Sequence, residues 1–513
     1  MDPLVLTFDL GTQSLRAALV DEQGSILSIA QKRYERPYFS KQPGWAEQEA
    51  SFYWDAICEQ SQALKAQSGE LWDRIGAVTL TTIRDSIVCV DENGKPLRPV
   101  ILWLDKRESD TTEPLPFINR TAFAAAGMTE AVRISRRISV CNWVRQNEPT
   151  LWDKTHRCLM LSGYLNYLFC GRMADSDASI IGHIPFDCKN RRWMTPKDLT
   201  YCVFPIEKEK QCELCAPGEI MGRLTAAAAE KTGIKVGTPF AATGSDKGCE
   251  SIGLSCLTPE KAAISFGTTA TVQYTIDRYV EPQNFMPAYP AAVKDRWNPE
   301  IQIYRGYWLI SWFKQEFADA EIAEAQTLGV NAEDILNRRL REIPAGCEGL
   351  MLQPYFTPGI TMPDARGSLI GFSEVHTRMH IYRAIIEGVN YALMEGMESL
   401  QSRMKVQTTS VFLAGGGSKS DEICRITANM FGLPCFRTQT NEAAVIGAAM
   451  LGFTALGVYT DIDAAAKGMV HIRDSFLPDM ELHNVYEQLY SEVFKKVFNR
   501  LSPLYARYSD IIK

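Results

Sequence analysis

One arrangement occurs twice in this chain: an apolar strand runs into a glycine with neighbouring hydroxyl residues, and a second apolar strand follows. The first copy is "LTFDLGTQSLRAALV" at residues 6–20, and the second is "KAAISFGTTATVQYTI" at residues 261–276. Apolar runs on both sides of a short polar segment are typical of β-hairpins. A single polar tip is most simply a turn in which Gly11 supplies a positive φ. Two copies, one in each half of the chain, instead predict a duplicated architecture.

The order of the other elements predicts an α/β fold with mixed sheets. Further strands are expected over residues 26–30, 75–80 and 86–90, and a helix over 49–65. The four-residue spacing of Ile381, Ile385, Val389 and Leu393 predicts a long amphipathic helix. A chain of 513 residues exceeds what one core usually supports. We therefore expect two domains, residues 1–254 and residues 255–513.

Charge and cysteine usage exclude several classes of protein. The net charge of −7 argues against a nucleic-acid partner, because such surfaces carry excess Lys and Arg. Residues 443–459 are apolar but too short and too rich in Gly and Ala for a membrane span, so we expect a buried, closely packed helix. The 14 cysteines are scattered and nothing at the N-terminus is typical of a secretion signal. We expect a cytoplasmic protein without nucleic-acid or membrane partners.

Two spacings that are typical of metal sites have simpler interpretations. Cys212 and Cys215 form a C-x-x-C pair, but no second pair lies near enough in sequence to complete a zinc site. His376 and His380 are four residues apart at a predicted helix start, where Thr377 stands in place of the glutamate of a zinc protease. We interpret the histidine pair as capping or solvated residues.

Three consecutive glycines follow a predicted strand and precede a helix in "VFLAGGGSKSDEICRITANMFGLPC", residues 411–435. Glycines allow a ligand to approach the backbone, and the N–H groups of the helix point back toward it. The chain contains no P-loop, and "GGGSKS" lacks the spacing of a dinucleotide fingerprint. Any bound phosphates must therefore lie in a different cradle.

These features together resemble the ribonuclease H-like, actin-type ATP-binding fold, and the chain is similar over essentially its whole length to the FGGY carbohydrate kinases. The resemblance depends on the order of many stretches, among them "GWAEQE" (44–49), "GKPLRPVILWLDKR" (94–107), "DSDASIIGHIPFD" (175–187), "GSDKG" (244–248), "PDARGSLIGFSEVHTR" (363–378) and "NEAAVIGAAMLG" (441–452). It implies two ribonuclease H-like domains with the active site in the cleft between them, and an ATP-dependent carbohydrate kinase activity.

The resemblance also implies a role for individual residues. Asp9 would hold Mg²⁺ through water, and Asp246 would be the catalytic base. The phosphates of ATP would contact Thr12, Gln13, Ser14 and Arg16 in the first domain and Gly267, Thr268 and Thr269 in the second. The adenosine would lie beside Gly415, Gly416, Gly417 and Ser420. A base suits the chemistry independently, because an alcohol must lose its proton as the O–P bond forms. The simpler alternative is that Asp246 only caps the next helix.

The substrate pocket combines features of two subfamilies. Arg84 and Asp85 in "TTIRDS" resemble glycerol kinases in charge, where xylulokinases carry Gly-Gln-Met-His-Gly, and Trp103 matches both. The glycerol-kinase pocket walls fall at Ser135 and Thr271, whose small side chains predict a wider pocket. We expect a homodimer that phosphorylates a ketose or polyol of about five carbons, with xylulose first and glycerol or another polyol second. An actin-like or chaperone-like ATPase switch without sugar kinase activity is the alternative from another class.

Overall fold

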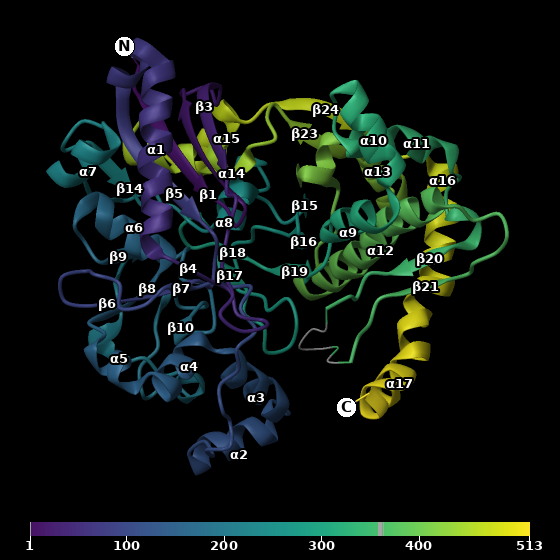
Figure 1. The fold of residues 1–513 in the computed structure, drawn as a ribbon, viewed down its shortest axis with the longest axis horizontal. Helices are drawn as coiled ribbons and strands as arrows, with labels where there is room; N and C mark the ends of the chain where they lie inside the picture. The colour runs from purple at the N-terminus through teal and green to yellow at the C-terminus, as the bar shows by residue number, and fades with distance from the viewer. Residues whose placement is uncertain (1, 358–361, 363, 513) are drawn as a thin grey trace. The chain divides into compact units, whose positions relative to one another are not determined.

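The computed structural model describes residues 2–357, 362 and 364–512. The chain divides into two compact units (Figure 1). Unit 1 comprises Met1–Ser255, Asp277–Asn298 and Glu442–Val470, and unit 2 comprises Cys256–Ile276, Pro299–Asn441 and His471–Lys513. The boundary that we predicted after residue 254 assigned the second and third segments of unit 1 to the other domain. Pro363, the first residue of the 363–378 stretch, lies outside the described residues.

The core of unit 1 is a six-stranded mixed sheet with the order β13-β14-β5-β1-β2-β3. The strands are β1 (Leu4–Leu10), β2 (Ser14–Val20), β3 (Ile26–Arg33), β5 (Ile75–Thr82), β13 (Ile220–Arg223) and β14 (Pro239–Ala241). All seven residues of β1 are buried, as expected for a central strand that is covered on both faces. β1 pairs with β2 antiparallel and with β5 parallel, so the first predicted hairpin is confirmed.

Alternation along β1 determines which helices each side chain meets. Phe8 lies on the face covered by α1 (Ala50–Ser68) and α6 (Leu161–Cys170), and its ring centroid is 5.7 Å from that of Phe169. Val5 lies on the opposite face, against α14 (Ala443–Ala455), where a Cβ atom on Gly452 would be 2.7 Å from Val5 Cγ1. Asp9 has the same parity as Val5, so it shares the α14 face of the sheet.

The apolar stretch at residues 443–459 forms α14, a buried helix, as predicted. It packs against α8 (Asp246–Gly253) at unusually short range. A Cβ atom on Gly447 would lie 1.9 Å from the carbonyl oxygen of Cys249, and one on Gly253 would lie 1.9 Å from that of Ala443. Within the described residues, no helix is long and apolar enough to cross a membrane.

Unit 2 repeats the sheet of unit 1, with the order β19-β16-β15-β22-β23-β24. Its strands are β15 (Lys261–Phe266), β16 (Ala270–Gln273), β19 (Glu300–Ile303), β22 (Ser410–Gly415), β23 (Cys435–Thr438) and β24 (Ile472–Phe476). β15 pairs with β16 antiparallel and with β22 parallel, and β22 pairs with β23 parallel. These relations match those of β1 with β2 and β5, and of β5 with β14, so the predicted duplication is confirmed.

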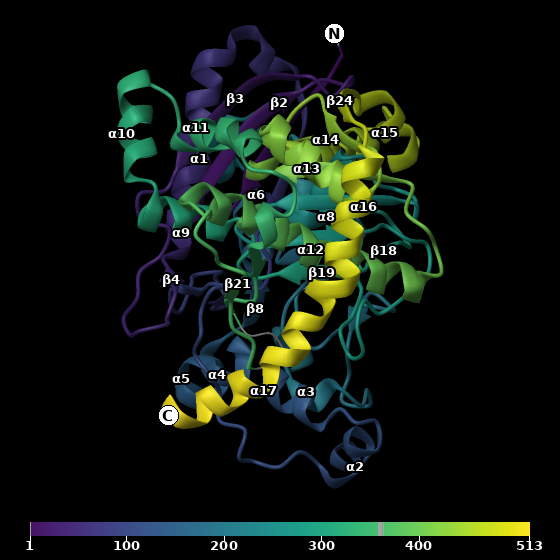
Figure 2. The ribbon, with the colours of Figure 1, turned by 90° about the vertical axis from the view of Figure 1, so that its right-hand side faces the viewer.

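The helices of unit 2 include the predicted long helix, α12 (Arg378–Met404). It begins with a capping box in which Thr377 and His380 bond to each other's backbone N–H groups, so His380 has a capping role, as predicted. His376 instead accepts the N–H of Ser373 over 2.8 Å and contacts the carbonyl of Cys347 over 3.0 Å. The C-terminal part of the chain is helical throughout: α16 (Met480–Gln488), a π-helix (Leu489–Phe494) and α17 (Lys495–Ile512), drawn in yellow in Figure 2.

Candidate active site

Three neighbouring strands of unit 1 end together and place the predicted site residues side by side. Asp9 in β1 pairs with Thr81 in β5, and the backbone N–H of Ile83 donates to the carbonyl of Leu10 over 3.1 Å. Beyond β14, Ser245 forms a parallel bridge with Thr82. The adjacent carboxyl ends of these strands therefore carry Asp9, the pair Arg84–Asp85, and Asp246. This edge is where open α/β sheets bind ligands.

Asp9 is a buried carboxylate in an acidic environment. It is 7% exposed, and burial raises its pKa to about 6. The Arg16 guanidinium lowers this pKa, while the carboxylates of Asp246, Glu442 and Glu250 raise it further. Arg16 contacts two of these acids, Asp9 at 3.3 Å and Glu442 at 2.7 Å. The surplus of negative charge favours a cation beside Asp9.

No group of three or more His, Cys, Asp or Glu side chains in the described parts of the chain could hold a metal ion by itself. Cys212 and Cys215 are both free cysteines. Mg²⁺ usually keeps several waters and binds through one or two carboxylates together with substrate phosphates. The single buried carboxylate of Asp9, within a cluster of negative charge, fits that mode of binding.

Asp246 is the first residue of α8, but it is not the cap of this helix. Ser245 is the N-cap, and its hydroxyl accepts a hydrogen bond from the N–H of Gly248 over 3.2 Å. Burial raises the pKa of Asp246, whereas Arg84 and Lys247 lower it and Glu250 raises it. The Asp246 carboxylate nevertheless bonds the first turn of α8, because its Oδ1 accepts the N–H of Lys247 over 2.8 Å.

Asp85 is held by a clamp that sequence reasoning missed. Its φ of 50° is in the left-handed region, and its N–H donates to the carbonyl of Ile181 over 3.0 Å. The carboxylate lies 2.9 Å from His183 Nδ1 and also accepts from the backbone N–H of His183. Burial lowers the pKa of His183, but the charge of Asp85 and their hydrogen bond outweigh it and raise this pKa. The only sequence signal was that His183 lies in the 175–187 stretch.

Trp103 is 36% exposed, and its indole N–H donates to the Thr12 hydroxyl over 3.0 Å. The structure thus connects a predicted substrate residue with a predicted phosphate residue. The Arg84 guanidinium lies over the ring of Tyr289, 5.2 Å from its centroid. Tyr289 belongs to the 277–298 segment, which sequence reasoning had assigned to the other domain.

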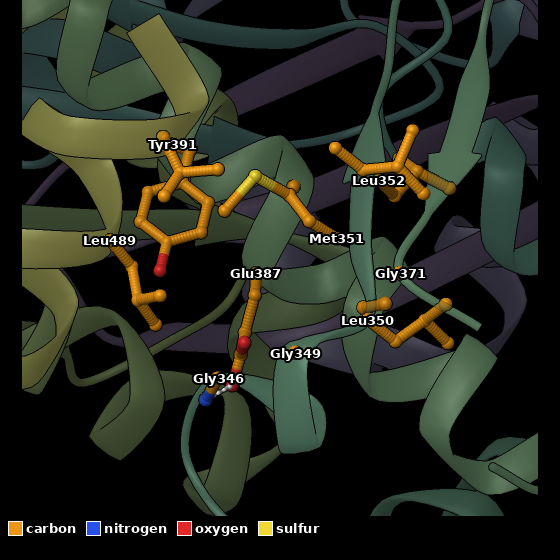
Figure 3. A pocket seen from close by; sticks show the side chains of 13 residues that line it. Gly346, Gly349, Leu350, Met351, Leu352, Gly371, Glu387, Tyr391 and Leu489 are labelled. Atoms are coloured by element: carbon orange, nitrogen blue, oxygen red, sulfur yellow. Dashed lines mark hydrogen bonds between the residues drawn. The ribbon is translucent and has the colours of Figure 1, made fainter. Parts of the chain in front are cut away.

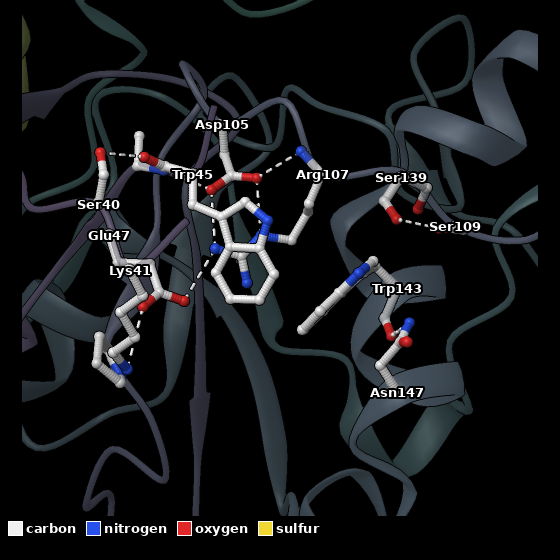
Figure 4. Close-up of polar contacts among 12 residues, drawn as sticks. Ser40, Lys41, Trp45, Glu47, Asp105, Arg107, Ser109, Ser139, Trp143 and Asn147 are labelled. Atoms are coloured by element: carbon white, nitrogen blue, oxygen red, sulfur yellow. Dashed lines mark hydrogen bonds and ion pairs between the residues drawn. The ribbon is translucent and has the colours of Figure 1, made fainter. Parts of the chain in front are cut away.

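A buried arginine anchors the loop that carries Trp103 (Figure 4). The Arg107 guanidinium lies between two indole rings, 3.9 Å from the centroid of Trp45 and 4.6 Å from that of Trp143. It also pairs with Glu47 at 2.9 Å and with Asp105 at 2.7 Å. Burial opposes the charge of Glu47, yet its arginine and lysine partners keep its pKa below the usual value. This cluster explains physically why the "GWAEQE" and "ILWLDKR" stretches occur together.

The predicted phosphate residues of unit 2 form the tip between β15 and β16. Thr268 is exposed, and Thr269 donates to the carbonyl of Tyr304 over 3.3 Å. The carbonyl of Gly267 accepts from the N–H of Tyr307 over 3.0 Å. In unit 1, the corresponding tip closes through a bond from Gly11 N–H to the Ser14 carbonyl, and Gln13 is exposed.

The three glycines at the end of β22 are not equivalent. Gly415 has a φ of 80°, and a Cβ atom there would lie 2.7 Å from the backbone of Phe266. A Cβ atom on Gly417 would lie 2.3 Å from the ring of Tyr307. Gly416 is exposed, and the atom nearest to a Cβ there would be 3.9 Å away, at ordinary van der Waals distance, so packing does not require a glycine. Packing explains two of the glycines and leaves Gly416 available to a ligand, while Ser420 caps α13 (Asp421–Phe431).

The predicted pocket walls remain untested. Ser135 is half-buried in α3 (Thr129–Ile138) of unit 1. Thr271 is buried in β16 of unit 2. The wider pocket therefore stays a prediction.

Comparison with known proteins identifies the family. The model of the N-terminal domain of the FGGY family of carbohydrate kinases matches residues 4–253, and that of the C-terminal domain matches residues 262–456. The chain belongs to the FGGY family of carbohydrate kinases, and it is an ATP-dependent carbohydrate kinase.

Its relatives differ in the substrate that they are named for. An uncharacterized sugar kinase of Escherichia coli K12, YgcE, is 27% identical, covering 96% of this chain and 92% of its own. A xylulose kinase of Staphylococcus epidermidis RP62A is 26% identical, covering 98% of both chains. The crystal structure of a gluconate kinase from Lactobacillus acidophilus shares the fold, with a TM-score of 0.82, 19% identity and coverage of 99% of both chains.

Proposed function

We propose that this kinase transfers the γ-phosphoryl group of Mg-ATP to a hydroxyl of a ketose or linear polyol of about five carbons, with a pentulose such as xylulose as the first candidate. One observation carries the proposal: Arg84 and Asp85 follow the end of β5, Asp246 follows β14, and a parallel bridge between Thr82 and Ser245 holds these two chain segments side by side. A guanidinium donates and a carboxylate accepts, and a pair of neighbouring hydroxyls requires both.

In the proposed mechanism, Asp246 accepts the proton of the attacking hydroxyl. Its raised pKa favours this role, because a carboxylate with an ordinary pKa is a weaker base. The clamp from His183 fixes the Asp85 carboxylate, so that the sugar meets an acceptor that is already oriented. Trp103 offers an apolar ring to the carbon chain of the sugar.

Asp9 would hold Mg²⁺ through water, and the metal would neutralise charge on the phosphates. The donors that we assign to these phosphates are Thr12, Gln13, Ser14 and Arg16 in unit 1, with Gly267, Thr268 and Thr269 in unit 2. We assign the adenosine to Gly415, Gly416, Gly417 and Ser420. The exposure of Gly416 supports this assignment, because packing alone leaves that glycine unexplained.

The preference for a pentulose is supported by the Staphylococcus epidermidis relative, which is named a xylulose kinase. The name of the Lactobacillus acidophilus structure makes gluconate a second linear substrate to test. Glycerol or another polyol is the alternative, since Arg84 and Asp85 resemble glycerol kinases in charge. An ATPase switch without sugar activity would need neither the clamped Asp85 nor Trp103.

The test is an ATP-consumption assay over xylulose, ribulose, gluconate, erythritol, fuculose, rhamnulose and glycerol, with kcat/KM measured for each. We expect a ketose or polyol of about five carbons to give the highest value, because Ser135 and Thr271, if they are the pocket walls, would leave room for it. If glycerol were best by about tenfold or more, the wide pocket would be wrong although the kinase class stood. If ATP were consumed equally with and without every sugar, an ATPase switch would replace the proposal.

A further inference from the structure

Unit 2 contains a cavity whose lining includes none of the residues assigned to the active site (Figure 3). Its volume is about 190 Å³. Its walls come from α12, from the strand pair β20 (Met351–Gln353) and β21 (Ser368–Ile370), from the preceding loop and from the π-helix. Most of the lining is apolar, including Leu350, Met351 and Leu352.

The cavity is open at one end and enclosed at the other. Gly349, Gly371 and Val493 line it and are exposed, whereas Leu352 and Tyr391 line it and are buried. A molecule can therefore enter from the solvent beside the three exposed residues. A Cβ atom on Gly388 would lie 2.5 Å from the carbonyl oxygen of Leu352, so close packing of α12 on β20 fixes the inner wall.

Among the residues that line this cavity, Tyr391 carries a buried hydroxyl that lacks a hydrogen-bond partner in the described structure. Tyr391 is 2% exposed, and its hydroxyl has no hydrogen-bond partner among the described residues. In Figure 3 this hydroxyl lies between the side chains of Leu489 and Glu387, both of which line the cavity. A buried hydroxyl without a partner is destabilising, so a ligand that offers it a hydrogen bond gains affinity there.

Glu387 determines the charge of the ligand that fits. This buried carboxylate accepts hydrogen bonds from Arg383 Nε and from the Tyr486 hydroxyl, each over 2.7 Å. Because the guanidinium neutralises the carboxylate, the cavity offers little attraction to a cation. A neutral ligand avoids the cost of burying a further charge.

The wall formed by residues 489–494 is a further sign of a site. π-Helices are rare and frequently occur at functional sites. This one contributes both Leu489 and Val493 to the cavity. Their spacing of four residues places both side chains on the same face of the helix.

We propose that this cavity binds a small, neutral, largely apolar molecule that carries one hydroxyl, such as a phenol or a short alcohol, with its hydroxyl bonded to Tyr391. An apolar cavity of about 150 Å³ is large enough for benzene, and this one is slightly larger. The inference does not depend on which sugar the enzyme phosphorylates.

The test compares phenol with benzene on the full-length chain, with affinities measured by ligand-observed NMR titration. We expect saturable phenol binding that weakens about tenfold in Tyr391→Phe, while benzene binds both proteins equally. Tyr505→Phe is the matched control, because the Tyr505 hydroxyl also lacks a partner in the described structure but does not line the cavity. It should leave phenol binding unchanged.

A second variant guards against a folding defect in Tyr391→Phe. Val493→Phe narrows the exposed mouth, and we expect it to weaken phenol and benzene alike. The proposal is overturned if phenol shows no saturable binding, or if Tyr391→Phe and Tyr505→Phe bind phenol as the wild type does.

Discussion

Asp9 illustrates how one residue can be favourable for a ligand and unfavourable for folding. Burial and three neighbouring carboxylates raise its pKa from 3.8 to about 6. A raised carboxylate pKa stabilises the fold below the unfolded pKa, and this contribution is lost as the pH rises through the folded pKa. Unit 1 should therefore lose stability between about pH 4 and pH 6 on account of Asp9.

Asp9→Asn should increase the free energy of unfolding of unit 1 at pH 7 by up to about 3 kcal/mol, because about two pKa units correspond to this energy. At pH 4 the two proteins should differ little. Urea unfolding at pH 4, 5.5 and 7 measures the difference. A wild type more stable than Asp9→Asn at pH 7 would contradict the prediction.

Asp246→Asn keeps the size and hydrogen bonding of the side chain and removes the base. We expect kcat to fall by roughly 10²-fold or more, with little change in the affinity for ATP. Asp187→Asn is the control, since it removes a half-buried carboxylate elsewhere in unit 1. Near-normal turnover of Asp246→Asn in the coupled assay would exclude Asp246 as the base.

His183→Gln tests the clamp on Asp85. Because the pair raises the pKa of His183, its contribution to stability is present below the unfolded pKa and is lost as the pH rises through the folded pKa. The variant should therefore lose more stability at pH 6 than at pH 9. It should also raise KM for the sugar more than it lowers kcat, since His183 positions Asp85. Equal loss at both pH values, measured by thermal unfolding, would exclude a charged clamp.

At the scale of elements, the sequence predicted the structures that are determined by a local residue pattern. Both hairpins, the glycine loop and α12 follow from apolar periodicity and from glycine placement. The π-helix at residues 489–494 was not predictable, because nothing local distinguishes it from the helices on either side. The clamp on Asp85 was missed for another reason. His183 lies far from Asp85 in sequence, and only the fold brings them together.

The contact between α8 and α14 predicts that a Gly→Ala substitution lowers the free energy of unfolding, which is opposite to its effect in an exposed helix. In a freely exposed helix, Gly→Ala stabilises by about 1 kcal/mol. At Gly447, the added Cβ would lie 1.9 Å from the carbonyl oxygen of Cys249, so the helices must separate. We expect Gly447→Ala to destabilise unit 1 by about 2 kcal/mol, measured by urea unfolding. A stabilised variant would show that the two helices are not in this close contact.

At the scale of the whole molecule, the two sheets share one topology but carry different chemistry. The loop after β5 carries Arg84 and Asp85, and the end of the corresponding strand β22 carries Gly415, followed by Gly416 and Gly417. The side chains that we propose for hydroxyl recognition thus lie in one copy, and glycine backbone lies at the equivalent place in the other. The segment at residues 442–470 follows the second domain in sequence order, but it belongs to unit 1 by its contacts, which arise only in the fold. The expected homodimer stays a prediction.

These assignments predict that xylulose and an ATP analogue slow hydrogen exchange in different parts of the chain. The residues that we assign to the sugar all lie in unit 1: Arg84, Asp85, Trp103 and Asp246. Xylulose alone should therefore slow exchange around residues 81–85 and 244–248 only. A non-hydrolysable ATP analogue with Mg²⁺ should instead slow exchange at residues 11–16, 267–269 and 415–420, because these backbone amides are assigned to the nucleotide. Gly416→Val should weaken the second response and leave the first unchanged, since only the nucleotide is assigned to the exposed backbone there. Xylulose protection of residues 415–420 equal to that given by the ATP analogue would contradict the assignment of the sugar and the adenosine to different copies of the fold.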